Sequence, residues 1–347
     1  MSLETYLRAM PKVELHVHLE GAIQPATLLE LARRNQVPLP ADTEAGLRRW
    51  YTFTDFPHFA EIYQTLSRCL RTADDLELIT RDFLAAQAAQ NIRHTEATYT
   101  ALTVHRNSGL SFEAQLAAIN RARAWAEHEF NTTLGLIIDI PREWSTPAEG
   151  EQVAEWAIAG HGQGVAALGL GGYEVGFPPE LFAAAFARAH AAGLPAVLHA
   201  GETEGPASIW SALEVGRSRR LGHGVRCLED ARLVDELRRR QIPLEVCPSS
   251  NVCLKVVPDW AAHPLPALLR AGLNVTLNSD DPPMFSTTLT DEYRQAAAVF
   301  GLGAADLEQL VLNAVAAALR PEAERRAQAA EFRAEFARLR RVHGVAE

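Results

Sequence analysis

Residues 165–201 read VAALGLGGYEVGFPPELFAAAFARAHAAGLPAVLHAG and place an Ala- and Leu-rich segment between two short β-prone runs. The runs, 165–172 and 195–201, are rich in Val, Leu and Ala, as is typical of strands that are buried on both faces. The segment between them has the composition of an amphipathic helix. The order strand, helix, strand predicts a βαβ unit with parallel strands.

The same alternation extends along the chain. Eight β-prone runs are separated by longer segments, most of them helical, such as FEAQLAAINRARAWAEHEF at residues 112–130. A count of eight favours a closed (β/α)₈ TIM barrel, an α/β fold, over an open doubly wound sheet. No GxGxxG follows the first run, so the dinucleotide fingerprint of the open alternative is missing. The runs span residues 13–19, 92–99, 133–140, 165–172, 195–201, 219–225, 242–248 and 274–281.

We expect one domain over residues 1–347, with two additions to the barrel. The connection at residues 21–91 is far longer than one helix and predicts a helical insertion, whereas residues 303–347 predict charge-rich terminal helices. Most aromatic rings of the insertion are expected to pack among its helices. A few are expected to form a lid, because loops that follow barrel strands emerge at the catalytic face. These rings belong to Trp50, Tyr51, Phe53, Phe56, Phe59 and Tyr63.

Composition and charge exclude several classes of protein. The net charge of -10 argues against a nucleic-acid partner, and no apolar run has the length of a membrane span. The first residues lack the apolar core of a signal peptide, and the four cysteines form no CxxC pair. We therefore expect a cytoplasmic protein with reduced cysteines and a small-molecule ligand. The oligomeric state is left open.

Ionisable residues gather where the predicted strands end, which is the rim at which barrel enzymes carry their functional side chains. Residues i and i+2 of a strand face the same side, so the two histidines of VELHVHLEG point together. Taken singly, each ionisable residue could be a core histidine or a helix cap. Their coincidence at one rim indicates a site. The set comprises His16, His18, His199, Glu202, His223, Asp280 and Asp281.

Three imidazoles and one carboxylate of this set suit Zn²⁺ or a similar divalent ion, which would lower the pKa of a bound water. Glu202 follows the third imidazole past a Gly turn, so it can act as a general acid/base without ligating. His223 can orient the attacking hydroxide. The fourth strand offers no Lys or Glu to bridge a second metal, so one ion per chain is expected. The expected ligands are His16, His18, His199 and Asp280.

Five motifs, in this order, resemble the adenosine deaminase family of the amidohydrolase superfamily between residue 11 and about residue 295. The resemblance implies hydrolytic deamination of a 6-aminopurine with release of ammonia, and it identifies the four ligands with the zinc ligands of the family. The motifs are PKVELHVHLEGAI, VLHAGETEGPASIW, RLGHGV, CPSSNV and NSDDP.

The resemblance also implies roles for five further residues. Glu202 matches the acid that protonates purine N1 as hydroxide adds to C6, and His223 matches the histidine that orients the hydroxide. Asp281 matches the carboxyl group that hydrogen-bonds N7. Gly172 matches the glycine whose N–H meets N3. Glu20 stands where the family often has an acid near the ribose.

The sequence motifs indicate the type of reaction more clearly than they indicate the substrate. Residues 169–174, GLGGYE, depart from the pattern usual for adenosine deaminases. EVGFPP resembles the adenine deaminase branch, but the paired serines typical of that branch are absent. SNVCLKVVPDWAAHPLP and NSDDPPMFSTTL are similar to the branch acting on 6-amino-6-deoxyfutalosine, an adenine nucleoside with a bulky aromatic group. We expect a nucleoside, adenosine or aminodeoxyfutalosine, with Gly171 and Gly172 leaving room near the sugar; free adenine is the alternative.

Two hypotheses from other classes remain open at this point. A binuclear amidohydrolase acting on esters or amides would need a second set of ligands and two metals per chain. A catalytically inactive barrel that serves as a binding module would be expected to have lost Glu202 or a metal ligand, and this chain keeps all of them.

Overall fold

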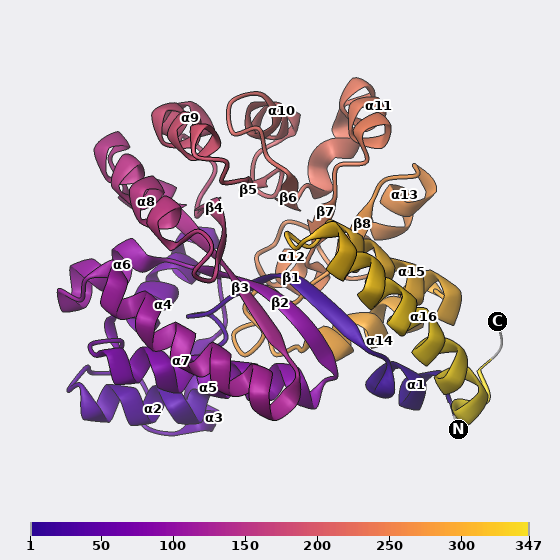
Figure 1. Cartoon of the computed structure of the whole chain (residues 1–347), viewed down its shortest axis with the longest axis horizontal. Coiled ribbons are helices and arrows are strands. Elements are labelled where there is room, and N and C mark those ends of the chain that lie inside the picture. Colours follow the sequence, from indigo (N-terminus) through magenta and orange to yellow (C-terminus); the bar gives the residue numbers. More distant parts are fainter. Residues whose placement is uncertain (1, 346–347) are drawn as a thin grey trace.

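The computed structural model describes residues 2–345 and contains a barrel of eight parallel strands, so the predicted (β/α)₈ fold is confirmed (Figure 1). Neighbouring strands are hydrogen-bonded in chain order, from the first to the eighth. The strands are β1 (Lys12–His18), β2 (Ile92–Tyr99), β3 (Thr133–Pro141), β4 (Val165–Gly171), β5 (Ala196–Ala200), β6 (Arg220–His223), β7 (Leu244–Val246) and β8 (Val275–Leu277).

The barrel closes where the chain leaves β8 beside β1. The N–H of Asp280 donates to the carbonyl of His16 at 3.1 Å, and the N–H of His18 donates to the carbonyl of Asp280 at 2.9 Å. Val17 and Asp280 are also paired in an isolated parallel bridge. Closure therefore places the end of β8 against the end of β1.

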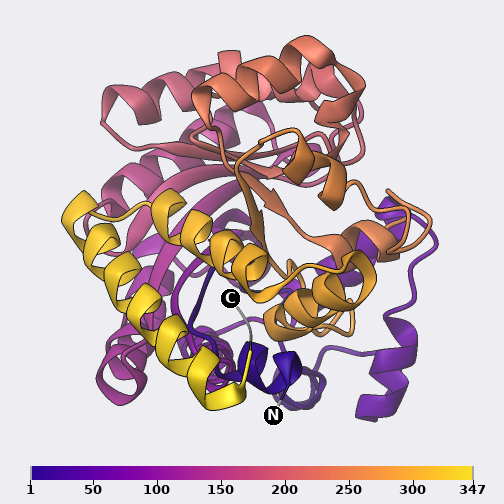
Figure 2. The same ribbon diagram turned by 90° about the vertical axis from the view of Figure 1, so that its right-hand side faces the viewer.

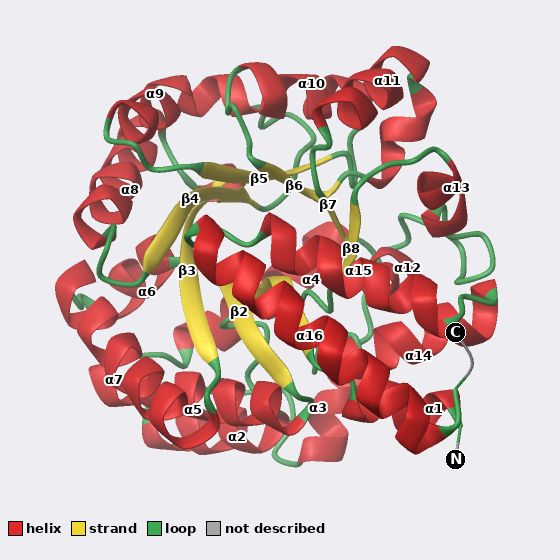
Figure 3. Ribbon diagram, turned by 45° about the vertical axis from the view of Figure 1, so that its right-hand side comes forward, coloured by secondary structure: helices red, strands yellow, loops and turns green. Residues whose placement is uncertain are grey.

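Helices surround the strands, with their apolar faces turned to the sheet (Figure 3). Local sequence sets where they begin: α8 starts after Thr146, whose hydroxyl accepts from the N–H of Glu149 while the Glu149 carboxylate accepts from the N–H of Thr146. The helices that follow β2 to β7 are α6 (Ala101–Ser108), α7 (Phe112–Phe130), α8 (Pro147–Gly160), α9 (Ala183–Ala191), α10 (Pro206–Glu214), α11 (Ala231–Arg240), α12 (Pro248–Cys253) and α13 (Leu265–Arg270), with 3₁₀ turns η1 (Arg142–Trp144), η2 (Pro179–Phe182) and η3 (Val225–Glu229).

The predicted insertion between β1 and β2 is helical, as expected. Of its six aromatic rings named above, those of Phe56, Phe59 and Tyr63 line a pocket. Phe53 packs edge-on against Phe285 with ring centroids 5.8 Å apart, and Trp50 packs against Tyr51. That the segment moves as a lid stays a prediction. The inserted helices are α2 (Pro25–Arg34), α3 (Glu44–Trp50), α4 (Phe56–Arg68) and α5 (Ala73–Ala89).

The terminal helices, gold to yellow in Figure 2, pack along the outside of the barrel. The turn after α15 is held there by two hydrogen bonds: the N–H of Leu319 donates to Glu96 Oε1 at 2.5 Å, and Arg220 Nη1 donates to the carbonyl of Ala317 at 3.1 Å. Residues 346–347 of the predicted terminal segment lie outside the described residues. The remaining helices are α1 (Leu3–Ala9), α14 (Leu289–Phe300), α15 (Ala304–Ala317) and α16 (Glu322–His343).

Two expectations about the cellular setting can be compared with the structure. In the described part of the chain, no helix has both the length and the apolar character that crossing a membrane requires. All four cysteines are free thiols, and three of them are buried.

Candidate active site

β1 places two imidazoles on one side of the strand, as the spacing of His16 and His18 predicts. Their Nε2 atoms lie 3.4 Å and 3.3 Å from the same oxygen, Oδ1 of Asp280. Asp280 has a φ of 64°, in the left-handed region that residues other than glycine rarely adopt. Its hydrogen bonds to β1 hold this conformation, and locally strained backbone of this kind is frequent at functional sites.

β5 and β6 supply two more imidazoles. His199 Nδ1 bonds to the carbonyl of Leu170 at 3.0 Å, and its Nε2 lies 3.2 Å from Nε2 of His18. His223 Nε2 lies 3.6 Å from Glu202 Oε1 and 3.9 Å from Asp280 Oδ2. The four imidazoles and the Asp280 carboxylate therefore meet at the C-terminal ends of β1, β5, β6 and β8.

This cluster fits a divalent cation. His16, His199, His223 and Asp280 each offer a ligand atom within 4.8 Å of the others, and His18 forms an overlapping group with Asp280 and Asp281. His16 Nε2 is buried and has no hydrogen-bond partner among the described residues, as expected of an atom meant to ligate. Imidazole nitrogen with carboxylate oxygen is a donor set preferred by Zn²⁺ and similar ions.

Charges around the cluster favour positive charge at its centre. Burial opposes protonation of His16, but the neighbouring carboxylates of Asp280 and Glu245 raise its pKa to about 10. The Glu245 carboxylate lies behind the ring, with Oε2 3.0 Å from His16 Nδ1. A carboxylate on the far nitrogen fixes the orientation of a ligating imidazole. Burial, followed by the charge of neighbouring His16, lowers the pKa of His199 well below its usual value, so this ring stays neutral.

Two further carboxyl groups of the cluster favour the protonated form. Burial, and next the charge of Asp280, raises the pKa of Glu202 and that of Asp281 well above their usual values. Glu202 Oε1 is buried without a hydrogen-bond partner among the described residues. Glu202 can therefore hold a proton at neutral pH and transfer it to a bound molecule.

The turn that carries Glu202 is held by another carboxylate, Glu174. Its two oxygens accept from the backbone N–H groups of Gly201, Glu202 and Thr203, each at 2.8 Å. Burial opposes the charge on Glu174, but Arg142 and these donors lower its pKa. Glu174 thus stays ionised and fixes the backbone on which Glu202 is mounted.

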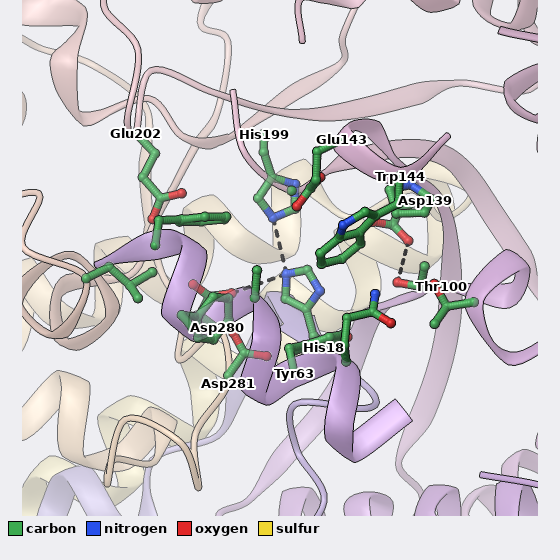
Figure 4. Close-up of a pocket in the computed structure, with 18 of the residues that line it drawn as sticks. His18, Tyr63, Thr100, Asp139, Glu143, Trp144, His199, Glu202, Asp280 and Asp281 are labelled. Carbon is green, nitrogen blue, oxygen red and sulfur yellow. Dashed lines mark hydrogen bonds and ion pairs between the residues drawn. The ribbon is translucent and has the colours of Figure 1, made fainter. Parts of the chain in front are cut away.

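A pocket opens over the cluster, with about 620 Å³ of empty space that includes volume open to solvent. Phe56, Phe59 and Tyr63 of α4 and Trp144 of η1 are its aromatic lining residues, and Figure 4 labels Tyr63 and Trp144. The residues predicted from sequence that line it are His18, Gly172, His199, Glu202, His223, Asp280 and Asp281.

Comparison with known proteins assigns the family. The sequence profile of the family described as adenosine deaminase matches residues 11–334. The chain belongs to the adenosine deaminase family. The match extends over the barrel and most of its terminal helices, so the resemblance seen in five motifs holds for nearly the whole chain.

Two relatives within this family carry different names. An aminodeoxyfutalosine deaminase of Streptomyces coelicolor is 41% identical over 318 residues, which are 91% of this chain and 81% of that protein. An adenine deaminase of Bordetella parapertussis is 40% identical over 314 residues, which are 90% of this chain and 98% of that protein. Identity to the two is nearly equal, so it does not decide between nucleoside and free base.

Solved structures agree with the family assignment. An adenine deaminase from Arthrobacter aurescens superposes with a TM-score of 0.90 at 34% identity, covering 95% of this chain and all of that one. An amidohydrolase from Burkholderia ambifaria with bound Zn superposes with a TM-score of 0.91 at 30% identity, covering 99% of this chain and 96% of that one.

Two residues predicted from this family's pattern lie behind the pocket rather than in its lining. His16 is 2% exposed, and its side chain reaches the cluster without lining the pocket. Glu20 is fully buried: its carboxylate accepts from the N–H of Thr100 at 3.0 Å and from the Tyr63 hydroxyl at 3.2 Å. Thr100 and Tyr63 do line the pocket, so in this family member Glu20 contacts the site through them.

Sequence reasoning missed three acids of the site: Asp139, Glu143 and Glu174. Asp139 lies near the C-terminal end of β3 and Glu143 lies in η1, and both line the pocket. Asp139 follows the β-prone run GLII, at a strand end where functional residues gather, so its position was a usable signal. Glu143 and Glu174 follow strands by a few residues and carry no such signal.

Proposed function

We propose that this chain hydrolytically deaminates a 6-aminopurine nucleoside and releases ammonia. One observation carries the proposal: a cluster of four imidazoles and an aspartate lies beside Glu202, a buried carboxyl group that lines the pocket and whose pKa is raised. Cation ligands beside a protonated acid are what hydrolysis at an electrophilic ring carbon requires. The named relatives, all deaminases, support the reaction class.

We propose one Zn²⁺ per chain, held by His16, His18, His199 and Asp280. A divalent ion held there would lower the pKa of a bound water molecule toward neutrality and so would supply hydroxide at physiological pH. The Zn-containing neighbour from Burkholderia ambifaria supports the choice of metal. His223 Nε2 lies 3.9 Å from Asp280 Oδ2 and 3.6 Å from Glu202 Oε1, so it faces both the cluster and the acid, which suits an orienting role.

The remaining residues act on the purine. Protonated Glu202 donates its proton to N1. This makes C6 more electrophilic, and N1 takes up the negative charge that develops as water adds to C6. His223 orients the attacking oxygen. Asp281 hydrogen-bonds N7, and the N–H of Gly172 donates to N3. The purine is therefore held at N1, N3 and N7. The amine at C6 then takes a proton and leaves as ammonia.

The residues on the side of the pocket away from the cluster favour a nucleoside over the free base as substrate. Beyond the cluster lie the carboxylates of Asp139 and Glu143 and the half-exposed ring of Trp144. Carboxylates suit sugar hydroxyls, and an exposed indole suits an aromatic substituent. Adenosine and aminodeoxyfutalosine both satisfy this description. Free adenine is the second candidate, because a 40% identical relative is named for it.

The test is turnover of adenosine, aminodeoxyfutalosine and adenine by zinc-loaded protein, followed as loss of the 6-amino chromophore. We expect kcat/KM to be highest for one of the two nucleosides. Activity on adenine alone would move the assignment to the free base, and no turnover of any of the three compounds would refute the proposal. Metal analysis should give one zinc per chain, reduced in His16→Ala and His18→Ala; two per chain would favour a binuclear amidohydrolase.

A further inference from the structure

Two adjacent glycines end β4, and two carboxylates occupy the space that side chains would otherwise take. A Cβ built on Gly171 would lie 2.4 Å from Asp139 Oδ2, and one built on Gly172 would lie 1.9 Å from Glu143 Oε2. Gly172 also has a φ of 90°, which strongly favours glycine. The space beside the two glycines is therefore occupied by carboxyl groups from β3 and η1 and is not an open volume.

Glu143 carries an unsatisfied acceptor in this position. Its Oε2 is buried and has no hydrogen-bond partner among the described residues, whereas Oδ1 of Asp139 accepts from the Thr100 hydroxyl at 2.8 Å. A buried acceptor without a partner is unfavourable by itself and is usually explained by a ligand or a water molecule. The same carboxyl group lines the pocket, so a bound molecule can reach it.

The position of Glu143 relative to the purine follows from the residues around it. Figure 4 shows Glu202 and Asp139 on opposite sides of the pocket, with Glu143 between them in that view. In the proposed complex Gly172 meets N3, and Glu143 lies against Gly172. N3 is next to N9, the atom that bears the sugar, so Glu143 faces the sugar side of the ring and not the reacting carbon.

We infer that Glu143 is a specificity residue that accepts a hydrogen bond from a ribose hydroxyl of the bound nucleoside. The inference rests on the proposed function and deepens it. The unpartnered Oε2 atom of Glu143 is a hydrogen-bond acceptor, so it selects an O–H donor of the bound molecule. Asp139, whose carboxyl group lies against Gly171, is a second carboxyl group on this side of the pocket.

The test compares Glu143→Gln with wild type on adenosine and on its 2′-, 3′- and 5′-deoxy analogues. A hydrogen bond to a charged group corresponds to about 10- to 100-fold in kcat/KM. We expect a loss of that size with adenosine. With the one analogue that lacks the recognised hydroxyl, the variant and the wild type should differ less than about threefold. Glu180→Gln, a matched change at an exposed position, should leave all four values unchanged.

The outcomes separate this inference from the proposed function. Equal losses on all four nucleosides would overturn the role of Glu143 while leaving nucleoside deamination intact. Adenine is assayed alongside them, and a loss confined to adenine would also overturn the inference and assign Glu143 to the N9–H of a free base. Wild-type protein that turns over none of the nucleosides would overturn both. Competitive inhibition by inosine and its deoxy analogues gives the same comparison without turnover, and unchanged melting temperature excludes misfolding.

Discussion

The carboxylate of Glu174 holds the backbone of Glu202: Oε1 accepts from the Glu202 N–H at 2.8 Å, and Oε2 accepts from the N–H of Gly201 at the same distance. Glu174 follows β4 and Glu202 follows β5, so the acid is positioned from a neighbouring strand. Glu174 also accepts from Thr203 and Ser208 and is 4% exposed.

Glu174→Gln should lower kcat while the metal stays bound. The amide replaces one acceptor oxygen with an NH₂ group that would face backbone N–H donors, so the turn must shift and Glu202 with it. We expect a 10- to 100-fold loss in kcat, since small displacements of catalytic groups have effects of this size. Steady-state kinetics with metal analysis checks this; full activity would show that the turn needs no such support.

Glu245→Gln should weaken metal binding. Its Oε2 lies 3.0 Å from His16 Nδ1, and its other oxygen pairs with the buried Arg220. Removing a carboxylate that orients a ligating histidine reduces metal affinity about 10- to 100-fold. Competition with a chelator measures the affinity, and Glu180→Gln serves as the control. Equal zinc affinities would mean that His16 is oriented by the backbone alone.

The fold could be predicted because its signal is local. Each buried parallel strand is an apolar run, and each is followed by a segment with helical composition. The positions of the strand ends were predicted less accurately: the runs 219–225 and 274–281 contain strands that end at His223 and Leu277. His223 and Asp280 adopt positive φ, and these conformations come from tertiary hydrogen bonds rather than from the residues' own preferences.

The site could be predicted where one segment supplies the pattern. His16 and His18 share a strand face, and His199 with Glu202 shares one turn. Glu143 could not be recognised, because its significance comes from Gly172, a residue 29 positions away on the next strand. The glycine pair was interpreted as free space near the sugar, whereas the structure places acids there.

Gly172→Ala should reduce activity more than Gly176→Ala does. Both glycines have positive φ, 90° and 82°, so both substitutions strain the backbone. A Cβ on Gly172 would also collide with Glu143, whereas nothing lies within 4 Å of a Cβ on Gly176. We expect KM to rise at least tenfold for the first variant and to change little for the second. Similar KM values would show that backbone strain, not the contact with Glu143, matters.

Lys12 should make stability depend on pH above neutrality. Burial lowers its pKa to about 7, and its Nζ donates to the carbonyls of Met10 at 2.8 Å and Gln90 at 3.1 Å. Between this value and the ordinary pKa of about 10.4, the unfolded chain binds the proton and the folded chain does not. Stability should therefore rise with pH across that window, by up to about 1.4 kcal/mol per pH unit.

The matched variant for this prediction is Lys12→Met, whose unbranched side chain is one atom shorter and lacks the titrating group. The difference in unfolding free energy between wild type and Lys12→Met should grow in favour of wild type from pH 7 to pH 9.5. Denaturant unfolding at both pH values measures it. A difference that is constant with pH would show that Lys12 stays charged in the folded protein.

The central claim is that Glu202 transfers a proton in a deamination that depends on the cation cluster beside it. Its most direct test is ammonia release from adenosine, aminodeoxyfutalosine and adenine by wild type and Glu202→Gln, both with metal content measured. Wild type should release ammonia from a nucleoside, and the variant should keep its metal and be at least about 100-fold slower. Turnover by Glu202→Gln at the wild-type rate, with the metal retained, would contradict the claim.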